Sequence, residues 1–363
     1  MGTTVLNLEQ DVALLTEQIM NIESVSGNEG ALADAVETAL RALGHLKVHR
    51  DGDSIVARTE LGRERRVVLA GHLDTVPLPR TEGARGTVPS QVIDSVLYGR
   101  GATDMKGGVA VQLALAAELR EPQFDVTYIF YDHEEVEAAK SGLGRLARNS
   151  PQLLEADFAI LLEPTNGTVE GGCNGTSRFV VRTHGVAAHS ARAWMGSNAI
   201  HAAAPILARL AEYDTATVTV EGLDYRECMN AVRITGGVAG NVIPDYCEVE
   251  VNYRFAPDKN LEQAEEIVRE LFTGFEVERT DGAEGARPGL DREVAASLVR
   301  SIGAEPKPKY GWTDVSRFSA LGIPAVNFGP GDPLLAHTDD EHVAQEDIRR
   351  CLNSLRSWLQ ASA

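Results

Sequence analysis

Three runs of apolar residues constrain the fold of this chain more than any other feature. They lie at 65–72, 125–131 and 157–163, and an apolar helical pattern at 106–119 separates the first two. Strands that are apolar on both faces are buried on both faces, which is typical of a parallel sheet covered by helices. The sequence therefore predicts an α/β fold with a mostly parallel central sheet flanked by helices.

The pattern changes near residue 176. Between 176 and 287, strand patterns with alternating polar and apolar residues accompany two helical patterns, which indicates a half-exposed sheet with helices on one face. Patterns of the first kind then resume, and 363 residues exceed one typical core. We therefore expect a discontinuous first domain at 1–175 and 288–363, and an inserted α+β domain at 176–287.

The charge of the chain restricts its partners. A formal net charge of −19 argues against nucleic acid or an anionic membrane, because both require clustered Lys and Arg, but a small anionic substrate needs only a few arginines. The N-terminal segment lacks a secretory signal pattern, and no run approaches the roughly 18 apolar residues that span a bilayer. We therefore expect a cytoplasmic protein. Its four cysteines form no C-x-x-C pair, which predicts free thiols.

The apolar runs share a second feature, which is that potential metal ligands stand at their carboxyl ends or in loops beside the sheet. These residues are His72, Asp104, Glu135, Glu163 and His337. The carboxyl ends of strands in an open α/β sheet face one crevice, so these side chains can converge. Each alone has an ordinary structural interpretation, such as a helix N-cap for Asp104. Their joint occurrence favours a metal site.

The chemistry of these five side chains indicates the metal. Two imidazoles and three carboxylates suit Zn²⁺, with Co²⁺ or Mn²⁺ as possible substitutes. A single open catalytic zinc typically has three protein ligands, whereas five ligands fit two metals that share a carboxylate. Asp104 is the natural bridge, because it is short and stands in the glycine-rich segment GRGATDMKGG.

Five motifs resemble, in order, the metal-site motifs of the M20 family of dinuclear zinc amidohydrolases and exopeptidases. They are GHLDTVP at 71–77, GRGATDMKGG at 99–108, DHEEVE at 132–137, EPTN at 163–166 and GPGDPLLAH at 329–337. Within the family, four further segments are most similar to the succinyl-diaminopimelate desuccinylases of actinobacteria. These segments are 184–201, 241–245, 252–258 and 311–333.

The resemblance implies a fold and an activity. The central sheet would be of the zinc-peptidase type, and the inserted domain would be a ferredoxin-like lid through which two chains form a homodimer. The substrate would be a small anionic acyl-amino acid. The reaction would convert N-succinyl-LL-2,6-diaminopimelate and water to succinate and LL-2,6-diaminopimelate, in lysine and diaminopimelate biosynthesis.

The resemblance also assigns the metal ligands. His72, Asp104 and Glu163 would hold one zinc ion, and His337, Asp104 and Glu135 would hold the other. It further implies a cis peptide bond after Asp104.

Three more residues would take part in catalysis. Asp74, two residues after His72, would orient that histidine as a carboxylate behind the metal ligand. Glu134 would be the general base, and partial burial would raise its affinity for a proton. His189, on the inserted domain, would reach the active site of the partner chain and stabilise the oxyanion.

Substrate binding is expected to fall to the inserted domain and to the loop at 311–317. The resemblance implies substrate contacts for Arg254, Asn241, Gly311 and Thr313, and we add Arg192 because it follows His189 by three residues. The chain has CNG at 173–175 and GNVIP at 240–244, where proteobacterial desuccinylases have RRG and NNVIP. One arginine and one asparagine that anchor the substrate or the interface are therefore absent.

Three alternatives remain open at the level of sequence. The first is another M20 amidohydrolase, such as an acetylornithine deacetylase or an aminoacylase, and the second is an M20 exopeptidase. The third is a zinc-binding relative without catalytic activity. Intact Glu134, His189 and metal-ligand positions argue against the third.

Overall fold

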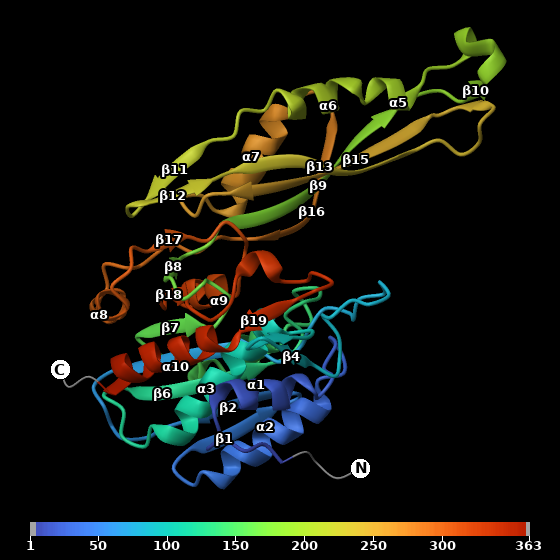
Figure 1. Ribbon diagram of the computed structural model, residues 1–363. Coiled ribbons are helices and arrows are strands. Elements are labelled where there is room, and N and C mark those ends of the chain that lie inside the picture. Colours follow the sequence, from blue (N-terminus) through green and yellow to red (C-terminus); the bar gives the residue numbers. More distant parts are fainter. Residues whose placement is uncertain (1–4, 361–363) are drawn as a thin grey trace. The chain divides into compact units, whose positions relative to one another are not determined.

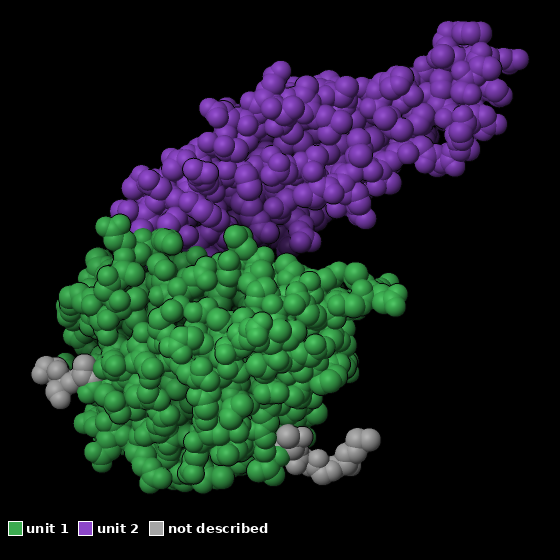
Figure 2. All heavy atoms as spheres, in the orientation of Figure 1, with its two compact units in different colours: residues 1–171, 289–307, 317–363 green, residues 172–288, 308–316 purple. Residues whose placement is uncertain are grey.

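The computed structural model describes residues 5–360, which form two compact units (Figure 2). Unit 1 comprises Met1–Gly171, Gly289–Lys307 and Arg317–Ala363, and unit 2 comprises Gly172–Pro288 and Pro308–Ser316. The segment 308–316, which the sequence pattern places in the first domain, belongs to unit 2 by its contacts. The elements at its two ends, β17 (Lys307–Pro308) and α9 (Val315–Ala320), are too short to give a sequence signal.

The centre of unit 1 is an eight-stranded sheet (Figure 1). From one edge to the other, its strands are β1 (Lys47–Asp51), β2 (Ser54–Arg58), β6 (Asp125–Tyr131), β3 (Arg66–His72), β7 (Phe158–Leu161), β18 (Ala325–Asn327), β8 (Glu170–Gly171) and β17 (Lys307–Pro308). The central pairs β6–β3, β3–β7 and β7–β18 are parallel, whereas β1–β2, β2–β6 and β18–β8 are antiparallel. The parallel centre brings the carboxyl ends of β3, β6 and β7 to one edge of the sheet.

Helices cover this sheet, and one of them is buried on all sides. The helices are α1 (Val12–Met20), α2 (Gly30–Ala42), α3 (Gly107–Glu118), α4 (Gly142–Asn149), α8 (Glu293–Ile302), α9 (Val315–Ala320) and α10 (Gln345–Gln360), with short turns η1 (Ala102–Lys106), η2 (Pro151–Leu153) and η4 (Pro333–Leu335). Helix α3 packs on β3 and β6, and α1 and α10 pack on α3 in turn (Figure 1). This burial explains why α3 lacks a polar face.

A small antiparallel sheet positions one part of the site. Its strands are β4 (Gln91–Ile93), β5 (Val96–Tyr98) and β19 (His342–Ala344), and β5 lies between the other two. His342 pairs with Tyr98 in the register of β19 and β5. The pairing therefore brings the residues before β19 next to the loop that follows β5.

Unit 2 contains a four-stranded antiparallel sheet with helices on one face. In spatial order, the strands are β13 (Cys228–Gly236), β15 (Tyr246–Phe255), β9 (Gly175–His184) and β16 (Glu276–Ala283), and the helices are α5 (Ala199–Ala202), α6 (Ala204–Ala211) and α7 (Leu261–Leu271). The element order βαββαβ with this strand order is that of a ferredoxin-like fold. Two short two-stranded sheets complete the unit: the hairpin of β11 (Thr217–Val220) and β12 (Leu223–Arg226), and the antiparallel pair of β10 (Ala188–His189) and β14 (Val242–Ile243). The predicted fold class is confirmed.

Within residues 5–360, no helix is both long enough and apolar enough to cross a bilayer.

Candidate metal centre

The parallel strands of unit 1 deliver the predicted ligands to one edge of the sheet. His72 is the last residue of β3, and it lies level with Tyr131, the last residue of β6, in the parallel register. Glu134 and Glu135 follow β6, and Glu163 follows β7 by two residues. Strand direction and register thus place these side chains together, as expected for an open α/β sheet.

The five predicted ligands form two groups that share one carboxylate. His72, Asp104 and Glu163 form one group, and Asp104, Glu135 and His337 form the other; within each group the potential ligand atoms lie within 4.8 Å of one another. The Nε2 atom of His72 lies 3.1 Å from Oδ1 of Asp104, and Nε2 of His337 lies 3.2 Å from Oδ2. Asp104 therefore presents one oxygen to each histidine, as a carboxylate shared between two metals would.

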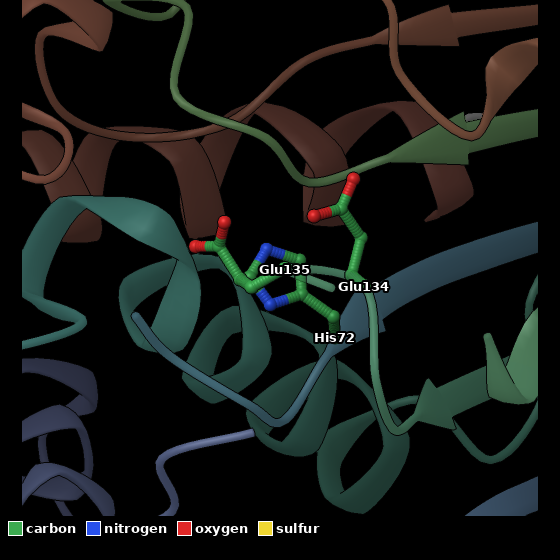
Figure 3. Close-up of side chains that lie close together, drawn as sticks. All are labelled: His72, Glu134 and Glu135. Atoms are coloured by element: carbon green, nitrogen blue, oxygen red, sulfur yellow. The ribbon is translucent and has the colours of Figure 1, made fainter. Parts of the chain in front are cut away.

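A third group contains both adjacent glutamates. The potential ligand atoms of His72, Glu134 and Glu135 also lie within 4.8 Å of one another. The two glutamate side chains point in different directions beside the His72 ring (Figure 3). Glu135 is a member of two groups and Glu134 of one, and the separate roles expected for them stay predictions.

The electrostatics of the cluster favour a cation. Burial lowers the pKa of His72, but the hydrogen bond with Asp104 and the charge of Glu163 outweigh it and raise this pKa well above its ordinary value. The hydrogen bonds of His337 with Asp104 and Glu135 raise its pKa to about 10. Burial raises the pKa of Asp104, while the bonds with both histidines lower it by more. The carboxylates thus hold positive charge strongly at this place.

The backbone around the ligands has two unusual features. The peptide bond between Asp104 and Met105 is cis, as the resemblance implied. His337 has a positive φ of 64°, a conformation that is uncommon for a residue other than glycine and is found disproportionately at functional sites.

Asp74 makes contacts that differ from the predicted ones. Its backbone carbonyl, not its carboxylate, lies 3.0 Å from Nδ1 of His72; the nearest carboxylate oxygen is 3.6 Å away. The carboxylate instead accepts the N–H groups of Glu134 and Glu135, each at 3.0 Å, and the hydroxyl of Ser26 at 2.7 Å. The side chain of Asp74 therefore holds the segment that carries the two glutamates.

Two buried residues that were not predicted hold the Asp104 loop. Glu341 is fully buried, and one oxygen of its carboxylate accepts the N–H groups of Asp104 and of the preceding residue, each at 3.1 Å. The other oxygen accepts the guanidinium of Arg100 at 2.7 Å. Arg100 also donates to the carbonyl of Thr338, the residue after His337, at 3.2 Å. The Arg100–Glu341 pair thus joins the loop of Asp104 to the loop of His337.

The remaining predicted site residues lie in unit 2, whereas every residue of the three groups lies in unit 1. His189 ends β10 and is exposed, and its Nδ1 accepts the N–H of Ala191 at 3.1 Å. The carbonyl of Asn241 accepts the N–H of Ser190 at 2.9 Å, and Arg192 is exposed in the following turn η3 (Ser190–Met195). The pairing of β10 with β14 therefore brings His189, Arg192 and Asn241 into one region.

The other three predicted substrate-binding residues lie elsewhere in unit 2. Arg254 is half-buried on β15, and its Nε donates to Oδ1 of Asn252 at 3.1 Å. Gly311 is exposed and Thr313 is buried, both within the segment 308–316. Their substrate contacts stay predictions.

Known proteins resemble this chain over nearly its whole length. Residues 68–361 match the sequence pattern of Peptidase family M20/M25/M40. A Mycobacterium tuberculosis (strain ATCC 25618 / H37Rv) protein, provisionally assigned as a succinyl-diaminopimelate desuccinylase, is 50% identical over 357 residues, which cover 98% of this chain and 99% of the relative. The succinyl-diaminopimelate desuccinylase of Corynebacterium glutamicum is 45% identical over 365 residues, which cover 98% and 97%.

A solved structure shares the fold. The Bacillus subtilis YXEP protein, described as a dinuclear metal binding peptidase from the M20 family, matches with a TM-score of 0.71 at 17% identity, covering 96% of each chain.

Proposed function

The chain belongs to peptidase family M20/M25/M40, and on this premise we propose that it is a metal-dependent succinyl-diaminopimelate desuccinylase. It hydrolyses the amide bond of N-succinyl-LL-2,6-diaminopimelate and releases succinate and LL-2,6-diaminopimelate. Two observations support this activity: relatives that are 45% and 50% identical over nearly the whole chain, and the two ligand groups that share Asp104. The second observation carries the proposal, because it places the chemistry in this chain's own residues.

The residues present fit two Zn²⁺ ions. His72, Asp104 and Glu163 would hold one, and Asp104, Glu135 and His337 the other, with nitrogen and oxygen donors of the kind that zinc accepts in hydrolases. When bound, such a pair polarises the amide carbonyl and lowers the pKa of the attacking water.

Glu134 is the proposed general base. Its position beside His72 and Glu135 suits a group that accepts a proton from the water that attacks the carbonyl carbon. The oxygen of that water bonds to the carbonyl carbon, and Glu134 then passes the proton to the departing amine as the C–N bond breaks. Asp74 supports this role, because its carboxylate fixes the N–H of Glu134.

A homodimer through unit 2 would complete the site. Strand β13 is an edge of the four-stranded sheet, and from Asn230 to Gly236 its residues are exposed, including Val232 at 59% and Ile234 at 48%. An exposed edge with apolar side chains favours pairing with another chain. In the proposed dimer, His189 of one chain donates to the oxyanion in the active site of the other. We place the enzyme in the cytoplasm, with the rest of diaminopimelate synthesis.

The test is a comparison of two substrates combined with metal analysis. We expect a higher kcat/KM on N-succinyl-LL-2,6-diaminopimelate than on N-acetylornithine, and a zinc content near two per chain. Faster hydrolysis of the acetyl substrate would overturn the assignment in favour of another M20 amidohydrolase. Dipeptides serve as the third substrate class, because their hydrolysis would identify an exopeptidase.

A further inference from the structure

The sheet of unit 2 has one polar face. Alternate side chains of β9 and β15, such as Phe179 and Val251, are buried in a cluster with residues of α5, α6 and α7. The intervening side chains point to the opposite face and are mostly charged or polar (strands labelled in Figure 1). Within the described part of unit 2, no helix covers this second face.

Two arginines on this face have carboxylate partners. Arg182 of β9 forms ion pairs with Glu248 at 3.0 Å, with Glu276 at 3.2 Å and with Glu278 at 2.6 Å. On β13, Arg233 pairs with Glu250 across the strands. Such pairing is expected in a chain that has 53 Asp and Glu residues and only 34 Lys and Arg residues.

Two arginines on the same face are different. Arg178 lies opposite Asn252, and Arg254 lies opposite Thr176, so the two arginines are diagonal neighbours on adjacent strands. Diagonal positions are within reach of long side chains. Among residues 5–360, neither guanidinium forms an ion pair, and the one hydrogen bond of the two is from Arg254 to Asn252. Even Asp281, opposite Arg178 in the pairing with β16, forms no ion pair with it.

The two arginines differ in exposure, because Arg178 is exposed whereas Arg254 is half-buried, so the cost of an unpaired charge falls on Arg254. Burial lowers the pKa of Arg254, and the positive charge of Arg178 lowers it further. Like charges on neighbouring strands repel, and a half-buried guanidinium without a counter-charge leaves its desolvation uncompensated. A planar carboxylate would supply the missing counter-charge to Arg254 and is within reach of Arg178 as well, because the guanidinium fork matches its two oxygens.

We propose that Arg178 and Arg254 together bind one carboxylate of the substrate. The inference rests on the proposed function, whose substrate carries three carboxylates. It assigns a specificity role to Arg178, which the family motifs do not mark. It also supplies a second guanidinium in unit 2, where CNG at 173–175 lacks the arginine of proteobacterial enzymes.

The test uses the metal-loaded enzyme with Arg178→Gln, Arg178→Lys and Arg254→Gln variants. Removing a charge-assisted hydrogen bond should raise KM for N-succinyl-LL-2,6-diaminopimelate by on the order of tenfold to a hundredfold, with kcat changed less than about threefold. Arg178→Lys should raise KM less, because it keeps the charge but lacks the fork. The double Gln variant should lose less than the product of the single losses, because both side chains bind the same group.

Arg269→Gln is the matched control. Arg269 is half-exposed on α7, pairs with Glu265 and lies on the helical side of the sheet, so its loss removes the same charge from unit 2 without touching the polar face. An unchanged KM in Arg178→Gln, an equal rise in the control, or a loss confined to kcat would refute the inference. Failure of the proposed function has a different signature, which is that the wild-type enzyme itself prefers N-acetylornithine.

Discussion

Replacing Glu341 by Gln tests whether the metal ligands depend on a buried ion pair behind them. The wild-type carboxylate accepts two backbone N–H groups of the Asp104 loop on one oxygen and the guanidinium of Arg100 on the other. Gln has the same shape but only one acceptor oxygen. In either orientation, its amide N–H₂ points at a donor, either Arg100 or the two N–H groups.

The expected loss in the free energy of unfolding follows from the burial of Arg100 and Glu341. Arg100 is 3% exposed and Glu341 is 0% exposed, so the variant leaves a buried positive charge without its partner. Breaking a buried pair in this way costs about 3–5 kcal/mol, although the intact pair contributes much less because desolvation offsets its attraction. Burial raises the pKa of Glu341 despite the bonds from Asp104 and Arg100, which is a sign of that offset. We expect a loss of about 3–5 kcal/mol in the free energy of unfolding.

The same variant should weaken metal binding. Residues that orient metal ligands typically cost 10–100-fold in metal affinity or activity when they are changed, and Arg100–Glu341 holds the loops of both Asp104 and His337. The assays are urea unfolding of the metal-free protein and zinc titration against a competing chelator.

Glu118→Gln is the control, because Glu118 pairs with Arg356 at the surface of the same unit and should change stability by less than about 1 kcal/mol. A Glu341→Gln protein with wild-type stability and zinc affinity would refute the reasoning.

Three further predictions concern the site, the acid stability and the assembly. Glu134→Gln should lower kcat by roughly 10²–10⁴-fold while zinc analysis still finds about two ions per chain, and loss of zinc would make Glu134 a ligand instead. Asp125→Asn should cost about 1–3 kcal/mol in urea unfolding at neutral pH, because the carboxylate accepts two N–H groups and a hydroxyl. Burial raises the pKa of Asp125, but these bonds lower it by more, so the pKa in the folded protein is below 3.8. The stabilisation by Asp125 is therefore present above pH 3.8 and is lost as the pH falls through the folded pKa. The Asp125→Asn variant should lack this loss of stability in acid. Ile234→Lys on β13 should yield monomers in light scattering and reduce kcat, whereas dimers of full activity would place the interface elsewhere.

The sequence could predict that the ligands converge, because strand burial and strand direction follow from local, regular patterns of apolar residues. Strands apolar on both faces are parallel and buried, and parallel strands deliver their carboxyl ends to one edge, so His72, Glu135 and Glu163 were expected together. Antiparallel pairing at the β8 edge of the sheet could not be predicted, because β8 and β17 are only two residues long. The ligand roles themselves stay predictions, although the structure brings the side chains together.

The supporting contacts could not be predicted, for a physical reason. Glu341 lies 237 residues from Asp104 in the sequence, and only the pairing of β19 with β5 brings them together. In the sequence, Glu341 belongs to the acidic run DDEH, which is typical of a solvated surface. Arg100 likewise looks like a loop residue among glycines. Glu341 and Arg100 support the Asp104 loop because they are buried together, which their residue types alone do not reveal.

The hydrogen bonds of Asp74 fix the orientation of the two adjacent glutamates, Glu134 and Glu135. A single carboxylate accepts the N–H groups of two consecutive residues, Glu134 and Glu135, so it fixes the backbone between them. Glu134 and Glu135 lie in a bend after β6, and in Figure 3 their side chains leave the backbone in different directions. The Nδ1 atom of His72 hydrogen-bonds to the backbone carbonyl of Asp74. Asp74 therefore positions both the histidine at the end of β3 and the segment that carries the two glutamates. An Asp74→Asn change would therefore disturb the base and a ligand together, through their backbone rather than through the imidazole alone.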